Sequence, residues 1–520
     1  MHAAVTDATA ASQADPGLRM SSARGRWVVA ATVLGSGIAA LDATVVGIAL
    51  PAIGRDFHTG VSSVQWVVDA YTLTLAGLLL LGGTLGDSYG RRKVFSIGVV
   101  WFALASLLCG VAPSVQVLIA ARALQGVGGA LLVPGSLAIL QASFAEEDRA
   151  AAIGAWSGLG GLATAIGPFL GGYLIGAVSW RLVFFINLPL AVAVLAITAR
   201  HVPETKAPGP VPRLDIRGAA CISGALAGIT YGLIAASSYG WGSVPVLVPL
   251  AVGAALLGLF IWVEDREPQP MLPLGVFRSR QFSAANAETF VVYAALGGLL
   301  FLLPTVLQVV SGYSPLASGA ALLPVTFIML LLSSRSGRLA SRIGPRLQMS
   351  VGPLVIAASF LLFTRIGGSG GYLTEVLPGV VVFGLGVAIM VAPLTATALA
   401  AAPADHAGVA SAVNNDVARA AGLIAVAVLP ALAGITGNSY LHPALLAHGF
   451  RMAAVIAAVF CAAGGVMAAL TIRNPSRAVG AEASPSESYC ALDATPLRSS
   501  RTPDPQAVPV TIPADQEGPS

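Results

Sequence analysis

Charged residues are scarce in this chain. Asp, Glu, Lys and Arg make up 10% of its 520 residues, whereas hydrophobic residues make up 56%. A soluble protein of this length needs more charge on its surface, so the composition excludes a soluble globular fold and indicates a polytopic membrane protein. The net charge is only +4, and the arginines lie in loops, which favours contacts with lipid headgroups over nucleic-acid binding.

Cysteine and histidine motifs are also absent. The four cysteines have no ligand spacing and the six histidines do not cluster, so we expect no disulfide framework and no metal site. The chain contains no G-x-x-x-x-G-K-[ST] and no H-E-x-x-H motif, which argues against ATP as energy source and against an enzyme. We expect no cofactor.

Long apolar runs dominate the chain. A run of about 20 residues can cross a bilayer as a helix, and about fourteen such runs occur, grouped as six, two and six. They lie near residues 27–50, 63–85, 94–112, 115–140, 150–178, 181–199, 218–237, 243–263, 282–310, 316–334, 348–365, 372–401, 407–435 and 449–472. The pattern predicts an all-α membrane protein of two six-helix bundles with two extra central helices.

This grouping divides the chain into five parts. We predict a cytoplasmic N-terminal segment (1–26), a first bundle (27–200), a linker with the two extra helices (201–280), a second bundle (281–472) and a tail (473–520). The first apolar run is too long for a signal peptide, so we expect it to stay uncleaved. The tail is rich in Pro, Ser and acids and is predicted to be disordered.

Positive charge predicts the topology. Arg and Lys gather in the loops after even-numbered spans, whereas the opposite loops carry little beyond Arg55, Arg181, Arg365 and Arg451. Because positive loops stay inside during insertion, we expect both termini to be cytoplasmic in a multi-pass plasma-membrane protein.

The stretch Gly82–Lys93, G-G-T-L-G-D-S-Y-G-R-R-K, joins the second and third spans. It resembles the signature loop of the major facilitator superfamily of secondary transporters, with Ser88 where that family often has a cation. The matching residues are Gly83, Leu85, Asp87, Gly90, Arg91 and Arg92. The resemblance implies that this loop locks the inner ends of two bundles together in one conformation, with Asp87 as acceptor.

A second copy of this spacing occurs at Gly337–Arg346, G-R-L-A-S-R-I-G-P-R, with Ser341 in place of the acid. It follows the second span of the last block, as the first copy follows the second span of the first block. The match favours duplicated halves, an arrangement that places a substrate site between them near the membrane midplane.

Three charged residues lie deep inside the predicted spans of the first block: Asp42, Asp69 and Arg122. With about 1.5 Å rise per residue, they lie about 9 to 12 Å below the outer ends of their spans and share one layer. Buried ionisable groups are costly, so a role in function is the first interpretation; a structural acid or a packing arginine is the alternative.

The surrounding sequences carry a further resemblance. L-D-A-T-V-V-G-I-A-L-P around Asp42 resembles the first-helix motif of 14-span drug:proton antiporters, and R-A-L-Q-G-V-G-G-A resembles the family's fourth-helix motif. The resemblance implies that Asp42 and Arg122 form the proton-coupling pair, with Asp69 assisting.

The fifth predicted span is rich in glycine, and its G-P-x-x-G-G string resembles the antiporter motif of exporters. The residues are Gly154, Gly167, Pro168, Gly171 and Gly172. Small residues four apart let helices approach closely, and proline bends the helix.

Candidates for the substrate cavity are Glu288, Gln125, Asn414 and Asn415. Glu288 can bind a cationic substrate or a proton, or extend to the inner interface. Asp416 and Arg419 lie three residues apart, which favours a local ion pair on one helix face.

Together these motifs resemble those of the 14-span drug-efflux family. The resemblance implies a proton-coupled efflux transporter that exports drugs or a secondary-metabolite antibiotic and confers resistance. Its partners would be protons, lipids and a small amphiphilic substrate, and we expect a monomer to be functional. Two alternatives remain: an importer of the same fold, and a membrane sensor or enzyme.

Overall fold

The computed structural model describes residues 17–206, 214–268, 270–367, 371–401 and 407–474. These residues are helical and contain no β-strand; Leu18 and Phe144 form one isolated bridge. The described residues up to Arg473 pack as one unit. The predicted tail and most of the predicted N-terminal segment lie outside the described residues.

The first half contains α1 to α7. Their bounds are α1 Ala23–Asp56, α2 Val61–Tyr89, α3 Arg91–Gly110, α4 Val115–Ser143, α5 Glu146–Ala177, α6 Leu182–Phe185 and α7 Asn187–His201. The short α6 and α7 together form one membrane-length segment. Each predicted span of the first block overlaps one of these segments.

The remaining helices are the central pair and the second half. The central pair is α8 Ile216–Tyr239 and α9 Val244–Glu264. The second half comprises η1 Leu274–Arg278, α10 Arg280–Val309, α11 Pro315–Ala320, α12 Leu323–Ile343, α13 Pro345–Phe363, η2 Tyr372–Val376, α14 Leu377–Ala400, α15 Ala407–Leu432, η4 Ser439–Leu441 and α16 Pro443–Thr471.

Local chemistry explains where several helices begin. The side chains of Ser22, Ser114, Ser279 and Ser314 each accept a hydrogen bond from a backbone N–H in the first turn. Such caps satisfy N–H groups that have no partner inside the helix. The helices are then extended by long apolar runs.

Thirteen helical segments among the described residues are long and apolar enough to cross a membrane. The further helix α5 has 32 residues, and its Ile166–Ala177 part is apolar. At 1.5 Å per residue, α5 is also long enough to span the hydrocarbon core. The protein is therefore an all-α, multi-pass membrane protein, and the helices agree with the prediction of about fourteen spans.

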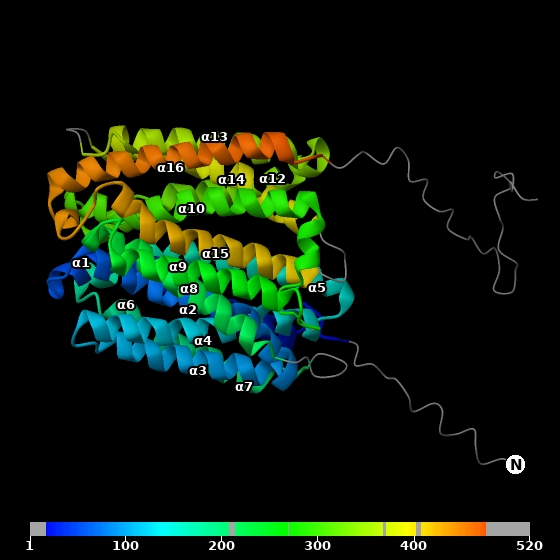
Figure 1. The fold of residues 1–520 in the computed structure, drawn as a ribbon. Coiled ribbons are helices and arrows are strands. Elements are labelled where there is room, and N and C mark those ends of the chain that lie inside the picture. Colours follow the sequence, from blue (N-terminus) through cyan, green and yellow to red (C-terminus); the bar gives the residue numbers. More distant parts are fainter. Residues whose placement is uncertain (1–16, 207–213, 269, 368–370, 402–406, 475–520) are drawn as a thin grey trace, which may run out of the picture. The chain divides into compact units, whose positions relative to one another are not determined.

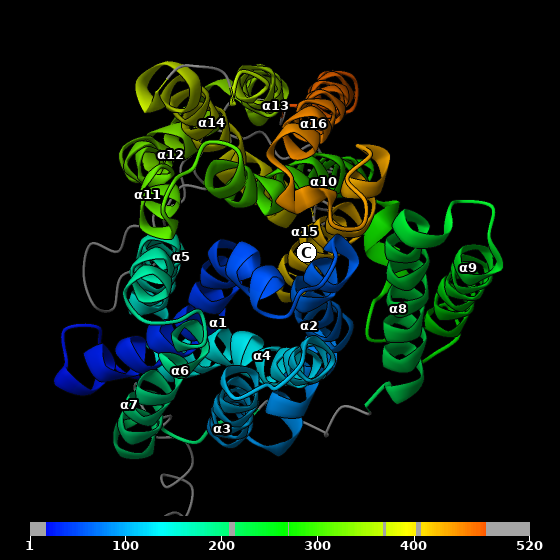
Figure 2. The same cartoon turned by 90° about the vertical axis from the view of Figure 1, so that its left-hand side faces the viewer.

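The two halves lie side by side with their long helices running along a common direction (Figure 1). Seen end-on, α1 to α7 lie below α10 to α16, and the halves meet along α1 and α10, α2 and α15, and α5 and α11 (Figure 2). The site residues of both halves therefore come from helices that meet at the centre.

The central pair lies at one side of this interface (Figure 2). Helix α8 packs on α2 of the first half and α15 of the second, and Leu226 of α8 contacts Ala76 and Leu423 in one apolar cluster. Helix α9 packs on α8, and Leu247, Val252 and Trp262 on it are exposed. The pair thus covers the α2–α15 junction.

Candidate functional site

Asp42 and Arg122 form an ion pair inside the first half. Arg122 Nη1 of α4 lies 2.5 Å from Asp42 Oδ2 of α1, and the side chains are 1% and 0% exposed. The shared depth predicted from the sequence thus brings these two residues into direct contact. A buried pair of this kind is costly to break, because the remaining charge then has no partner.

Amide and hydroxyl groups surround this pair. Gln125 Nε2 and Asn187 Nδ2 donate to Asp42 Oδ1 at 2.8 and 3.1 Å. The same two amides reach Ser106 Oγ at 3.2 and 2.9 Å, and all three side chains are buried. The carboxylate of Asp42 therefore belongs to one network of polar groups from α1, α3, α4 and α7.

Arg122 Nη1 also donates to Gln125 Oε1 at 2.6 Å, and further contacts of Arg122 come from α2 and α6. Its Nε donates to Val67 O at 3.0 Å. The guanidinium lies 4.4 Å from the ring centre of Tyr71 and 5.8 Å from that of Phe184. These cation–π contacts and hydrogen bonds reduce the cost of burying a cation. A proton on Asp42 would remove the charge on which the arrangement depends.

Asp69 lies apart from this network. It is fully buried, and neither of its carboxyl oxygens has a hydrogen-bond partner among the described residues. Arg122, at the same predicted depth, contacts the backbone of α2 at Val67 but pairs with Asp42. Asp69 instead lines the central cavity.

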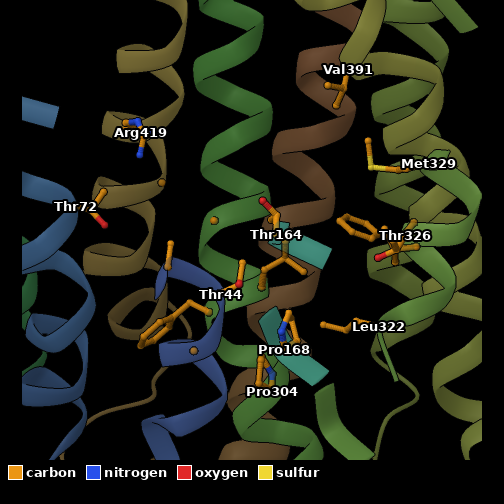
Figure 3. A pocket seen from close by; sticks show the side chains of 18 of the residues that line it. Thr44, Thr72, Thr164, Pro168, Pro304, Leu322, Thr326, Met329, Val391 and Arg419 are labelled. Carbon is orange, nitrogen blue, oxygen red and sulfur yellow. The ribbon is translucent and has the colours of Figure 1, made fainter. Parts of the chain in front are cut away.

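A cavity of about 1050 Å³ lies between the two halves. Its wall comes from α1, α2 and α5 of the first half and α10, α12, α14 and α15 of the second. Figure 3 shows Thr72 and Arg419 on one side and Thr326, Met329 and Val391 on the other. Most of the wall is apolar, and the charged residues among its described lining are Asp69 and Arg419. The size and lining suit a drug-sized, largely apolar ligand.

The halves close together at the end where α1 finishes and α2 begins. Gln308 Nε2 donates to Ile48 O at 3.0 Å, Gln65 Nε2 donates to Val426 O at 2.6 Å, and the backbone N–H of Val61 donates to Gly437 O at 2.9 Å. Each of these hydrogen bonds joins the first half to the second. This end of the cavity is therefore sealed.

The cavity extends toward the opposite end. The cavity wall reaches Gly154 in the first part of α5 and Gly337 in the last part of α12. A Cβ added at Gly154 or Gly158 would meet no atom within 4 Å. The cavity is thus open toward the end that carries the Gly82–Lys93 stretch.

The other glycines of the fifth-span motif make tight contacts. A Cβ at Gly167 or Gly171 would collide with Thr44 or Val45 of α1, and one at Gly172 would meet the backbone of Pro315, the first residue of α11. The motif therefore joins α5 to α1 and to the second half at the closed end, whereas Gly154 faces the open space.

The Gly82–Lys93 stretch is helical except at Gly90, where α2 turns into α3 with φ of 114°. Asp87 Oδ1 pairs with Arg91 Nη2 at 2.7 Å. The backbone N–H of Arg91 donates to Thr205 O at 2.9 Å and that of Arg92 to Glu204 Oε1 at 3.1 Å. These contacts all lie within the first half and the segment that follows α7.

The predicted cavity candidates lie elsewhere. Gln125 belongs to the Asp42 network, and Asn414 Nδ2 donates to Asn286 Oδ1 at 3.1 Å and Thr289 Oγ1 at 2.9 Å. Asn415 is exposed. Glu288 on α10 is fully buried with no partner for either carboxyl oxygen among the described residues. None of the four is among the described residues that line the cavity.

The predicted local ion pair between Asp416 and Arg419 is wrong. The ion pairs within 4.0 Å among the described residues do not include them. Asp416 Oδ1 and Arg419 Nε are buried without a hydrogen-bond partner in the described part of the chain. Spacing of three residues allows contact on a helix but does not fix the rotamers, and here Arg419 extends along the cavity wall instead.

Two residues of the network were not predicted. Asn187 and Ser106 carry no formal charge, and an amide or hydroxyl in an apolar run barely changes its hydropathy. The one signal in the sequence was Asn187 itself, a polar residue inside the sixth predicted span, where polar groups usually pair with neighbouring helices.

The sequence profile of the Major Facilitator Superfamily matches residues 32–427. The chain is 36% identical over 418 residues to the multidrug resistance protein Stp of Mycobacterium tuberculosis, covering 80% of this chain and 77% of the relative. It is 37% identical to the tetracenomycin C resistance and export protein of Streptomyces glaucescens, over 79% of this chain and 77% of that protein.

Solved structures share the fold. A bacterial homologue of the human lysosomal transporter Spinster, described as inward-facing and unoccupied, superposes with a TM-score of 0.61 at 16% identity, covering 88% of this chain and all of that one. A peptide transporter of the POT family in complex with sulfate gives a TM-score of 0.62 at 16% identity over 86% of this chain and 94% of that one.

Proposed function

The chain belongs to the major facilitator superfamily, and from this premise we propose that it is a proton-coupled exporter of amphiphilic drugs or of a secondary-metabolite antibiotic. Relatives named for multidrug and antibiotic resistance support export as the direction. The protein would act as a transporter and not as an enzyme, moving its substrate through the cavity between the halves.

The observation that carries this proposal is the relation between the cavity and the buried charges. The cavity has an apolar wall suited to an amphiphile, and Asp69 lies on that wall. Behind it, within the first half, Asp42 and Arg122 form the buried pair. A substrate site next to ionisable groups is what coupling between substrate and proton requires.

Coupling follows from the network around Asp42. When a proton neutralises Asp42, Arg122 loses its counter-ion and the hydrogen bonds of Gln125 and Asn187 must rearrange. These side chains come from α1, α4 and α7, so the change alters the packing of the first half. Asp69 would receive the proton from the cavity or return it.

Alternating access would occur by rocking of the halves about the central cavity. In the present conformation the halves are held together at one end by Gln308 and Gln65, and the cavity extends toward the other end. Rocking would reverse this, bringing Asp87 and its stretch against the second half. With both termini cytoplasmic, the open end faces the cytoplasm.

The test is uptake of fluorescent drugs and antibiotics into inverted membrane vesicles with an acidic interior. We expect accumulation in the wild type that collapses with a protonophore, and loss of accumulation in Asp42→Asn. Asp56→Asn is the matched control, because Asp56 lies on the same helix but pairs with Arg181 at the partly exposed end. This control should retain most of the uptake.

Accumulation that persists in Asp42→Asn would move the coupling role to another acid, with Asp69→Asn and Glu288→Gln tested next. Uptake that proceeds only against the expected direction would identify an importer instead. If no compound moves in a proton-dependent way, the proposal of proton-coupled transport fails.

A further inference from the structure

One cation on the described part of the cavity wall has no ion-pair partner. Arg419 lines the cavity (Figure 3). Among the described residues it forms no ion pair within 4.0 Å, and its Nε has no hydrogen-bond partner. Placing a guanidinium in a largely apolar site without a counter-ion is costly.

The position of Arg419 on α15 is fixed by its neighbours. Gly422, Leu423 and Val426 also line the cavity, and residues three, four and seven apart lie on one face of a helix. Gly422 lies against Gly297 of α10, and Val426 accepts the hydrogen bond from Gln65 of α2. This face of α15 is therefore held between both halves, and Arg419 continues it along the cavity.

No carboxylate among the described residues lies within ion-pair distance of Arg419, although Asp416 is near enough to interact with it electrostatically. Asp42 is paired with Arg122, and Asp416, one turn earlier on α15, lies beyond 4.0 Å from the guanidinium. Asp69 shares the wall but accepts no hydrogen bond from any described residue. Glu288, the other candidate for recognising substrate charge, is not on the described wall.

We propose that Arg419 recognises an anionic group on the substrate, and that the substrate class is an amphiphile with an apolar body and one carboxylate or comparable oxyanion. This inference rests on the proposed export function. Guanidinium is planar, always charged and able to donate two parallel hydrogen bonds to a carboxylate. The apolar body would contact Phe301, Phe383 and Met329 on the remaining wall.

The test is equilibrium binding to the purified full-length protein without a proton gradient. Three probes share one apolar body and differ in charge: pyrenebutyrate, its neutral amide, and the corresponding amine. We expect the wild type to bind the carboxylate at least tenfold more tightly than the amide. Arg419→Gln should lose this preference, since a charge-assisted hydrogen bond contributes about tenfold to hundredfold in affinity, while Arg419→Lys should retain part of it.

Two matched variants test whether a neighbouring acid or surface charge sets the preference. Asp416→Asn removes the carboxylate predicted to pair with Arg419, and it should leave the carboxylate-to-amide ratio unchanged. Arg451→Gln removes an exposed cation of the same half and should likewise leave the ratio unchanged. Thermal unfolding of each variant establishes that it is folded before binding is compared.

An unchanged ratio in a folded Arg419→Gln protein would overturn the inference, as would tighter binding of the amine than of the carboxylate in the wild type. The outcome is separable from that of the export proposal. Proton-driven uptake with no dependence on Arg419 would reject only the anion site. Arg419-dependent binding without proton-driven uptake would reject only the export function.

Discussion

In both halves of the protein, the second long helix ends at a glycine with positive φ and the chain turns there into the next helix. Gly90 ends α2 and Gly344 ends α12, with φ of 114° and 85°. Two residues later, Arg92 donates to Ala199 O in the last turn of α7, and Arg346 donates to Ala469 O in the last turn of α16. This agreement supports the internal repeat inferred from the spacing.

The halves differ in how they treat buried charge. In the first half, Asp42 and Arg122 neutralise each other within a hydrogen-bond network. In the second half, Glu288 and Asp416 leave buried carboxyl oxygens without partners among the described residues, and Arg419 faces the cavity. The first half thus holds a closed charge network beside the unpaired Asp69, whereas the second half presents the cation Arg419 to the cavity without an ion-pair partner among the described residues.

The largest expected effect tests this difference directly. Arg122→Gln should destabilise the folded protein by about 3 to 5 kcal/mol, because it leaves Asp42 buried without its counter-ion. Arg419→Gln, the same change in the other half, should not destabilise the protein, since no ion pair within 4.0 Å is lost and an unpaired cation is removed. Thermal and denaturant unfolding in one detergent measures both.

The double variant Asp42→Asn with Arg122→Gln is the control for this prediction. It removes both charges, so its destabilisation should be smaller than the sum of the two single effects. Equal destabilisation by Arg122→Gln and Arg419→Gln would contradict the contrast between the halves.

The next effect concerns the contact between the halves at the closed end. Gly172→Ala should destabilise the present conformation by about 1 to 3 kcal/mol, because the new Cβ would lie 2.7 Å from Leu316 Cα, where backbone must shift. Gly176→Ala is a matched control on the same helix, since a Cβ there meets nothing within 4 Å. Unfolding temperature and vesicle uptake should fall only in Gly172→Ala. Equal values for Gly172→Ala and Gly176→Ala would show that the contact with α11 has room for a methyl group.

Much of this fold could be predicted from sequence because the signals are local. The membrane spans follow from hydropathy, and the turns at Gly90 and Gly344 follow from glycine at positive φ. The shared depth of Asp42 and Arg122 could also be predicted, because depth along a helix depends only on residue count.

The depth of a residue along its helix does not give the direction in which its side chain points about the helix axis. The sequence therefore did not predict which side chains contact each other. It placed Asp69 in the layer of Arg122, but Asp69 lines the cavity and Arg122 points toward Asp42. The same limit explains Arg419, whose side chain follows the cavity and not Asp416. Which face of a helix meets a neighbour depends on packing between distant segments, which spacing alone does not contain.

The smallest expected effect on stability separates the two turns. Asp87 pairs with Arg91 in the first turn, whereas Ser341 at the matching place in the second bonds to Arg338 O. Asp87→Asn should change unfolding free energy by less than about 1 kcal/mol, since partly exposed ion pairs contribute little. It should nevertheless slow uptake strongly, because Asp87 is proposed to bind the second half once rocking closes this end. Ser341→Ala is the control and should leave uptake near the wild-type rate. Wild-type uptake by folded Asp87→Asn would contradict the locking role. The difference between Asp87 and Ser341 would then concern only the local structure of the two turns.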